Sequence, residues 1–215
     1  MRRGDPWGAP AIGPPDITVR GDDAVLAAAV GSHPGARVRF EPSSESDVGR
    51  GVGLGPGSGT GATEVPFDLL ELDDATRAVN AVVLGVPPDR LGRWHRRRAV
   101  VVKVDGRTIF EGIATTVVIA TGQFLRGADL VPRGHPGDGR VEVQVYALDP
   151  GPRRSMRRRL ATGTHLPHPA IVEGSGRRVS VSAAQPWPLE IDGRPADART
   201  GLTATVRAGA WRLLI

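Results

Sequence analysis

From residue 67 onward the sequence is a succession of short segments rich in valine, isoleucine and leucine, separated by residues that favour turns. Apolar segments at this close spacing predict the strands of an antiparallel β domain. In VKVDGRTIF, residues 102–110, Asp105 and Gly106 form a dipeptide typical of a two-residue hairpin turn. Aromatic residues make up only 4% of the chain, so the core has to come from aliphatic side chains. We therefore expect an antiparallel β-sandwich over residues 67–215.

The sequence before this part has an α/β pattern. Strands are expected at residues 17–19 and 36–40 and a helix at 23–31, because β-branched runs flank an alanine-rich stretch. The sequence SSESD, residues 43–47, is typical of the cap that precedes a helix. In residues 53–66 glycine alternates with other residues and no P-loop lysine follows, so we interpret this stretch as a linker.

These patterns divide the chain into three parts. Residues 1–15 are rich in proline and glycine and are expected to be disordered. Residues 16–66 form a shortened α/β segment resembling a nucleotide-binding domain, which ends in the glycine-rich linker. Residues 67–215 form the β-sandwich. The predicted fold class is α/β plus β, without internal repeats.

The charge of the chain permits an anionic partner but does not require one. Of 28 basic residues only Lys103 is a lysine, and the formal net charge is +5. The chain has no cysteine, which excludes disulfides and thiolate chemistry and fits a reducing compartment. No apolar stretch approaches the roughly 20 residues that a membrane helix needs, and the N-terminus lacks the apolar core of a signal peptide. We expect a cytoplasmic protein, with peripheral membrane contact as an open alternative.

Several stretches carry a resemblance to a known family. VRGDDAV, residues 19–25, stands where that family has VGGDGTV, and SSESDVGRGVGL, residues 43–54, stands where it has GTGNDFARALGL. Residues 115–146 and the turn PLEIDGRP, residues 188–195, match its later strands. The sequence thus resembles the bacterial lipid kinases of the diacylglycerol kinase and sphingosine kinase-like type, whose two-domain fold is shared with NAD kinases. The resemblance implies ATP and Mg²⁺ as cofactors and phosphorylation of a lipid hydroxyl.

The resemblance also implies which residues would form the site. Gly21 and Asp22 match the glycine and aspartate of the nucleotide turn, Ser44 keeps the hydroxyl of the second motif, and Asp47 matches its aspartate. Asp138 matches an aspartate in the family's cation-stabilised loop and is the candidate Mg²⁺ ligand. The alternative for Asp138 is an Asx turn, in which the side chain bonds its own backbone.

The motifs depart from the family where the chemistry is most demanding. Asp23 and Glu45 replace glycines, which would bring negative charge toward a polyphosphate. Arg194 stands at the position of the family's general base, and arginine cannot accept a proton because its pKa exceeds about 12. Asp192, two positions earlier, is the candidate replacement for the catalytic base.

About 60 residues that precede the nucleotide turn in the family have no counterpart here. We therefore interpret the chain as a degenerate, non-catalytic relative that binds a lipid or protein partner. An active ATP-dependent kinase acting on a diacylglycerol-like hydroxyl is the alternative. A homodimer is a further expectation, because a shortened parallel sheet leaves an edge that invites pairing.

Two arginine clusters remain outside this comparison. One, RLGRWHRRR at residues 90–98, contains Arg96, Arg97 and Arg98, and the other, PRRSMRRRL at 152–160, contains Arg157, Arg158 and Arg159. They suit a lipid or anionic membrane surface, although a solvated helix face is the common alternative. Nucleic-acid binding is a weaker hypothesis, because no nucleic-acid motif accompanies them. His135, His165 and His168 could supply imidazoles for zinc, but their proline-rich surroundings favour loop histidines without a ligand role.

Overall fold

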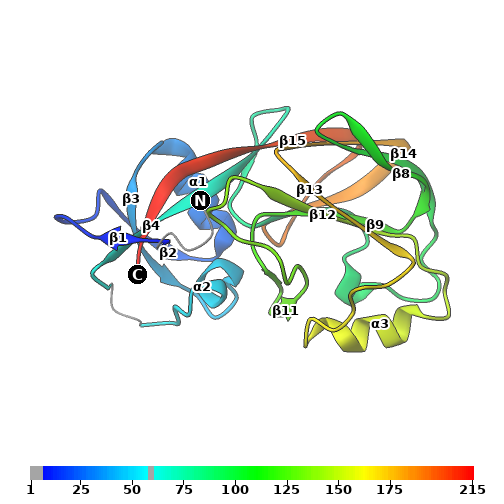
Figure 1. The fold of residues 1–215 in the computed structure, drawn as a ribbon, viewed down its shortest axis with the longest axis horizontal. Coiled ribbons are helices and arrows are strands. Elements are labelled where there is room, and N and C mark those ends of the chain that lie inside the picture. The colour runs from blue at the N-terminus through cyan, green and yellow to red at the C-terminus, as the bar shows by residue number, and fades with distance from the viewer. Residues whose placement is uncertain (1–6, 58–60) are drawn as a thin grey trace.

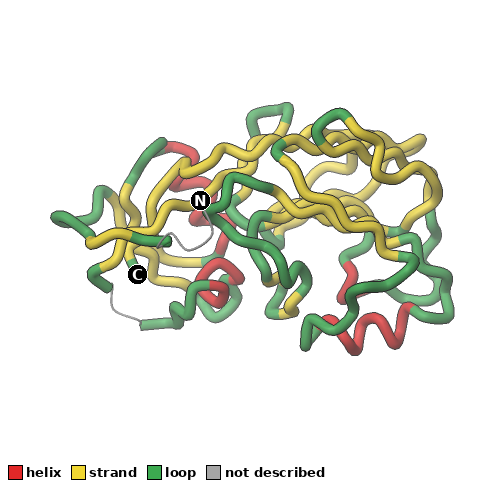
Figure 2. Tube along the Cα trace, viewed as in Figure 1, coloured by secondary structure: helices red, strands yellow, loops and turns green. Residues whose placement is uncertain are grey.

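The computed structural model describes residues 7–57 and 61–215, whose strands form one continuous thirteen-stranded sheet and a separate two-stranded pair. Figure 1 shows an elongated molecule with a smaller lobe, which carries the first strands and α1 and α2, and a larger lobe made of strands. Figure 2 shows the helices at the periphery of both lobes. The predicted class, an α/β segment followed by an antiparallel β-sandwich, is confirmed.

The smaller lobe follows the predicted order of elements. A parallel ladder joins its first two long strands, and the second of these also pairs in parallel with the last strand of the chain. Asp22 caps the first helix and Ser46 caps the second, as the polar residues at these positions predict. The elements are β2 (Ile17–Gly21), α1 (Asp23–Ser32), β3 (Arg37–Pro42) and α2 (Asp47–Gly51).

Two long antiparallel strands, β4 (Thr63–Leu72) and β15 (Arg194–Leu214), run from one lobe into the other. Their ends in the smaller lobe place Phe67 and Trp211 in its core, where the two rings lie 4.7 Å apart. The expected boundary between residues 66 and 67 therefore falls inside β4. Because both lobes share these strands, they form one structure rather than two separable domains.

The larger lobe is built from antiparallel pairs around an aliphatic core of valine, leucine and isoleucine with Trp187. The hairpin predicted at Asp105 and Gly106 is present, and both residues have the positive φ angles that its turn requires. The strands are β5 (Arg77–Ala78), β6 (Ala81–Gly85), β7 (Arg98–Val104), β8 (Arg107–Ala114), β9 (Thr116–Ala120), β12 (Val141–Tyr146), β13 (Ile171–Gly176) and β14 (Arg178–Ile191).

Short elements complete the larger lobe. The predicted arginine-rich helix forms and buries Met156 and Leu160 against the lobe, because these side chains lie one turn apart on one face. The elements are the 3₁₀ helix η1 (Pro88–Arg90), the hairpin strands β10 (Phe124–Leu125) and β11 (Ala128–Asp129), and α3 (Arg153–Leu160).

The start of the described chain is more ordered than the sequence suggested. Strand β1 (Ala9–Pro10) pairs with β4, and the ring of Trp7 packs against Phe67 and His135. The expectation of disorder over residues 1–15 therefore fails for this part, because one aromatic side chain and a two-residue ladder fix it. Residues 1–6 lie outside the described residues.

In the part of the chain that the structure describes, no helix has the length and apolar character needed to cross a bilayer.

Candidate functional site

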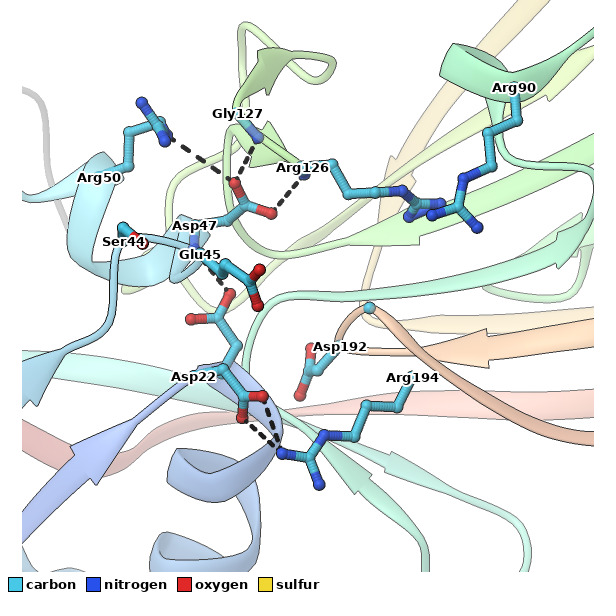
Figure 3. Close-up of a pocket in the computed structure, with 12 residues that line it drawn as sticks. Asp22, Ser44, Glu45, Asp47, Arg50, Arg90, Arg126, Gly127, Asp192 and Arg194 are labelled. Carbon is cyan, nitrogen blue, oxygen red and sulfur yellow. Dashed lines mark hydrogen bonds and ion pairs between the residues drawn. The ribbon is translucent and has the colours of Figure 1, made fainter.

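A cavity of about 400 Å³ lies where the beginnings of α1 and α2 meet the β10–β11 and β14–β15 turns and η1 (Figure 3). Its walls are dominated by carboxylates and arginines. The sequence placed Asp22, Ser44, Asp47 and Asp192 at one site, and all four line this cavity. Its lining residues are Asp22, Asp23, Ser44, Glu45, Asp47, Arg50, Arg90, Arg126, Gly127, Asp192, Gly193 and Arg194.

Asp22 is held by the backbone of its own helix and by Arg194. Its Oδ1 accepts a hydrogen bond from the Val25 amide at 2.9 Å, and Arg194 Nη2 donates to both carboxylate oxygens at 2.8 and 3.0 Å. Burial alone would raise the pKa of Asp22, but the hydrogen bonds from Arg194 and Val25 outweigh it and hold the pKa below its usual value. Both carboxylate oxygens of Asp22 are therefore bound by donors of the chain.

Gly21, the other matching residue of this turn, has φ +136°, which explains the glycine. It does not line the cavity, and a Cβ there would lie 3.3 Å from the Val25 side chain.

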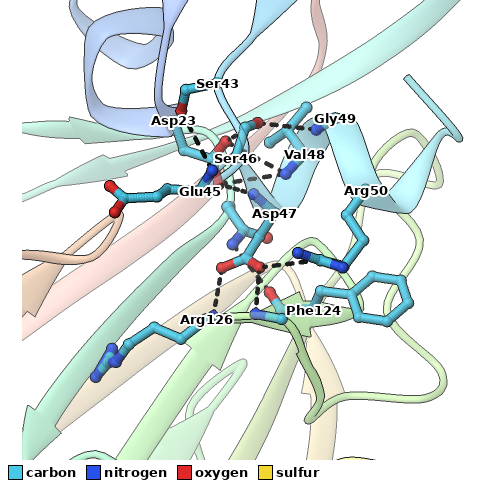
Figure 4. Close-up of polar contacts among 12 residues, drawn as sticks. Asp23, Ser43, Glu45, Ser46, Asp47, Val48, Gly49, Arg50, Phe124 and Arg126 are labelled. Atoms are coloured by element: carbon cyan, nitrogen blue, oxygen red, sulfur yellow. Dashed lines mark hydrogen bonds and ion pairs between the residues drawn. The ribbon is translucent and has the colours of Figure 1, made fainter. Parts of the chain in front are cut away.

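Asp23 turns its carboxylate onto the start of α2 (Figure 4). It accepts hydrogen bonds from Ser46 Oγ at 2.5 Å and from the amides of Asp47 and Val48 at 3.1 and 3.2 Å. Burial raises the pKa of Asp23 to about 6, and the nearby charge of Asp47 adds to this, while the Ser46 hydrogen bond opposes it. Sequence reasoning treated Asp23 as a charge facing a polyphosphate, whereas the structure shows it occupied by backbone and hydroxyl donors.

Asp47 joins α2 to the turn between β10 and β11. Its carboxylate accepts hydrogen bonds from the amides of Arg126 and Gly127, and Arg50 lies 4.0 Å away. Burial raises the pKa of Asp47, although the two amides and the arginines lower it. The aspartate that the resemblance assigned to nucleotide binding therefore spans two parts of the chain that are 79 residues apart at Arg126.

Asp192 is buried at the β14–β15 turn, in a left-handed conformation with φ +46°. It accepts hydrogen bonds from three consecutive amides, those of Val79, Asn80 and Ala81, at 2.8, 3.0 and 2.9 Å. Burial raises its pKa to about 7 against the effect of these amides. The candidate base lines the cavity, but its two oxygens accept hydrogen bonds from the residues that lead from β5 into β6.

Every arginine that lines the cavity has a carboxylate within 4 Å. Arg194 pairs with Asp22, Arg50 with Asp47, and Arg90 with Asp89. Arg126 donates to Glu190, and its Nε lies 3.3 Å from Asp89. The cavity therefore offers few charges that are not already compensated by the chain itself.

Arg126 and Glu190 were missed by sequence reasoning. They are 64 positions apart, and no local pattern links them. The signal that could have found Arg126 is its neighbour Gly127, since both lie in the stretch that resembles the family, at residues 115–146. Glu190 lies two positions before Asp192, in the stretch 188–195 that also resembles the family.

Asp138 does not approach this cavity. Its Oδ1 accepts a hydrogen bond from the Arg140 amide at 2.9 Å, which is the Asx-turn alternative. The neighbouring Asp68 binds the amides of Gly139 and Gly209. Within residues 7–57 and 61–215, no group of three or more histidine, aspartate and glutamate side chains could hold a metal ion. The Mg²⁺ assignment of Asp138 thus finds no supporting ligand set there.

The three histidines considered for zinc lie in different surroundings. His135 lies against Trp7, and His168 Nδ1 accepts the Ala170 amide. His165 is buried, and burial lowers its pKa.

Known proteins share this architecture. Residues 89–215 match the model of the family described as the YegS C-terminal NAD kinase beta sandwich-like domain, and this span is more than half of the chain. The chain belongs to this family. The resemblance inferred from the sequence motifs is thereby confirmed. A comparison with curated proteins finds none that matches.

Solved structures show the same fold in more distant sequences. A structure described as a diacylglycerol kinase from Bacillus anthracis str. Sterne superposes with a TM-score of 0.74 at 14% identity, covering 92% of this chain and 75% of that one. An Archaeoglobus fulgidus NAD kinase in complex with ATP gives 0.54 at 11% identity, covering 93% and 77%. Yeast NADH kinase complexed with NADH gives 0.51 at 13%, covering 92% and 60%. At these identities the similarity establishes the fold.

Proposed function

We propose that this chain is a non-catalytic member of the lipid kinase-like family, which binds a lipid or protein partner and does not use ATP. The observation that carries the proposal is Asp23. Its carboxylate takes up the Ser46 hydroxyl and the amides of Asp47 and Val48, in the segment that resembles half of a nucleotide cleft. Backbone amides bind phosphate oxygens only when no other acceptor occupies them.

The neighbouring carboxylates support the same conclusion. Asp47 is committed to the amides of Arg126 and Gly127, and Asp192 to three further amides. Mg²⁺ prefers near-octahedral oxygen ligands, and catalysis of phosphoryl transfer depends on metal ions that neutralise the phosphate charge. These carboxylates would have to leave their present donors to serve it, so the lining residues fit Mg²⁺-ATP poorly.

The position of the family's general base supports the proposal independently. Arg194 carries a permanent positive charge and donates both contacts to Asp22. Asp192 has a pKa near neutrality, which suits a base, but its oxygens face the amides of residues 79–81. Asp22, Asp23, Asp47 and Asp192 are therefore each bound by donors of the chain, which opposes a role for any of these four as the base for a substrate hydroxyl.

The alternative, an active kinase, has one observation in its favour. Asp22, Ser44 and Asp47 do line a common cavity of about 400 Å³, as a nucleotide site would require. Phosphoryl transfer from labelled Mg²⁺-ATP to diacylglycerol in mixed micelles separates the two functions. We expect no transfer above the protein-free background, with the wild type and Asp22→Ala indistinguishable. Transfer by the wild type that Asp22→Ala abolishes would establish the kinase instead.

A further inference from the structure

A strongly basic surface lies beside the cavity, on the larger lobe. It is formed by the loop after η1 and by the outer side of α3, and we call it the basic face. Trp94, in the loop after η1, is 85% exposed, among the most exposed large apolar side chains of the described residues. The basic face consists of Arg93, Trp94, Arg96, Arg154, Arg158 and Arg159, all exposed.

The two parts of the basic face are fixed to each other by a buried arginine. Arg153 is only 1% exposed, and its Nη1 donates to the carbonyls of Gly92 and His95 at 2.9 and 2.7 Å. Its Nε and Nη2 donate to the Leu148 carbonyl, which anchors the start of α3 to the end of the β12 segment. The loop after η1 that carries Trp94, which we call the tryptophan loop, is therefore fixed to α3 by these hydrogen bonds.

The arginines of the basic face are not neutralised by the chain. Within residues 7–57 and 61–215, no ion pair joins Arg93, Arg96 or the α3 members of the face to a carboxylate. Arg97, next to them, pairs with Asp149 at 2.9 Å and does not belong to the face. The guanidinium of Arg93 lies 4.8 Å from the ring centroid of Trp94, which holds charge and aromatic ring together.

We propose that the basic face docks the protein on the headgroups of an anionic lipid bilayer. Arginines attract anionic headgroups, and an indole with an apolar body and one N–H group favours the boundary between headgroups and acyl chains. A single exposed tryptophan with the guanidinium of Arg93 against its ring matches this boundary. Nucleic-acid surfaces that stack bases generally use several aromatic side chains along a groove, and this face has one. Docking through this face does not require the loss of ATP binding that is proposed above.

Docking through the basic face would bring the cavity close to the bilayer. Arg90 of η1 lines the cavity, the tryptophan loop follows η1 directly, and α3 packs against η1. The path from Arg90 to Trp94 is only four residues. A lipid headgroup held at the face would therefore lie near the cavity mouth rather than across the molecule.

Co-sedimentation with vesicles tests the proposal. We expect the wild type to bind vesicles of phosphatidylcholine mixed with phosphatidylglycerol and not to bind vesicles of phosphatidylcholine alone. Added salt should release the bound protein. Arg154→Glu with Arg158→Glu should lower the affinity more than tenfold, since each basic residue near an anionic surface is worth about 1 kcal/mol, or roughly fivefold. The matched control is Arg107→Glu with Arg178→Glu, which carries the same charge change on the exposed β7–β8 and β14 surface. The control should bind like the wild type.

A second variant separates docking from general charge. Trp94→Ala leaves every arginine in place and removes a side chain that is 85% exposed, so folding should be unaffected. It should weaken vesicle binding several-fold, and the fluorescence blue shift on adding anionic vesicles should disappear. The proposal would be overturned if the double variant of the basic face and the control double variant lost the same vesicle affinity. It would also be overturned if Trp94→Ala bound vesicles as tightly as the wild type. Salt-sensitive binding of duplex RNA or DNA without vesicle binding would assign the face to nucleic acid.

Discussion

The molecule has two arginine-rich regions that behave in opposite ways. In the cavity, Arg50, Arg90, Arg126 and Arg194 each lie within 4 Å of a carboxylate. On the basic face, the arginines around Trp94 have no such partner in the described part of the chain. The sequence of the face contains no acidic residue between Arg90 and Arg98, whereas the cavity collects acidic residues from three separate segments of the chain.

The difference shows that arginine content alone does not define an anion-binding surface. What decides is whether the chain supplies its own anions to the arginines and to nearby amides. The cavity does, through Asp22, Asp23, Asp47 and Asp192, whose oxygens accept hydrogen bonds from arginine, hydroxyl and amide donors of the chain. The basic face does not, since in the described residues no ion pair joins its arginines to a carboxylate.

The largest expected effect concerns the pH dependence contributed by Asp192. Its folded-state pKa, about 7, lies above its ordinary value of 3.8, so the folded state binds more protons between these values. Its contribution to the free energy of unfolding is therefore fully present below about pH 4 and falls as pH rises toward 7, by an amount on the order of several kcal/mol.

Comparing wild type with Asp192→Asn isolates this contribution from the other carboxylates. Urea unfolding of both proteins from pH 4 to pH 7 should show the stability of the wild type, relative to the variant, declining across the window. A difference that rises with pH would mean that Asp192 is stabilised as a carboxylate by its amides, and that burial does not dominate.

Removing the Asp192 side chain altogether should cost about 2–3 kcal/mol at pH 5, because three buried amides lose their acceptor. Urea unfolding of Asp192→Ala measures this loss. Asp192→Asn is the control, since asparagine tolerates the left-handed backbone and keeps one acceptor oxygen. Equal losses in the two variants would contradict the role given to the amide contacts.

Asp23→Ala should lower the free energy of unfolding by about 1–2 kcal/mol, since Ser46 and the amides of Asp47 and Val48 lose a common acceptor. Glu45→Ala is matched to it, because Glu45 is a carboxylate of the same cavity that is exposed. Glu45→Ala should leave the midpoint of thermal unfolding unchanged. If both variants unfold alike, Asp23 does not hold α2 as described.

The smallest effect contrasts one arginine from each region. Arg126→Ala leaves the largely buried carboxylate of Glu190 without its guanidinium and should cost about 1–2 kcal/mol. Arg158→Ala on the basic face removes an exposed side chain without an ion pair in the described residues and should change stability by less than about 0.5 kcal/mol. Chemical unfolding of both variants tests the contrast. A larger loss in the free energy of unfolding for Arg158→Ala than for Arg126→Ala would contradict it.

Much of the fold could be predicted because its signals are local. The Asp105-Gly106 hairpin, the cap at Ser46 and the helix around Met156 each follow from a few adjacent residues. The order of motifs also predicted the family. The expected boundary at residue 66 missed because β4 is long enough to pair with β15 in both lobes, and no local pattern shows which strands are shared.

The sequence brought together some of the residues that line the cavity, but not their contacts, and two of its candidates, Gly21 and Asp138, do not line it. The sequence placed Asp22, Ser44, Asp47 and Asp192 together, and they do line one cavity. It did not predict that Asp23 binds donors on α2, or that Asp192 binds amides more than 110 positions away. These contacts depend on where separate turns meet in space. Nearly every residue has a backbone amide, so the identity of the donor residue does not show that its amide binds a distant carboxylate.

Titration calorimetry of the wild-type protein with Mg²⁺-ATP, with a thermal melt on the same samples, tests the central claim most directly. A ligand at 100 times its Kd stabilises a protein by about 2.7 kcal/mol, which for a chain of this size corresponds to a shift of roughly 5 °C or more. We expect no binding heat and no shift at millimolar Mg²⁺-ATP. Saturable binding with a clear shift, lost in Asp22→Ala, would contradict the claim that the chain's own carboxylates and arginines occupy the site.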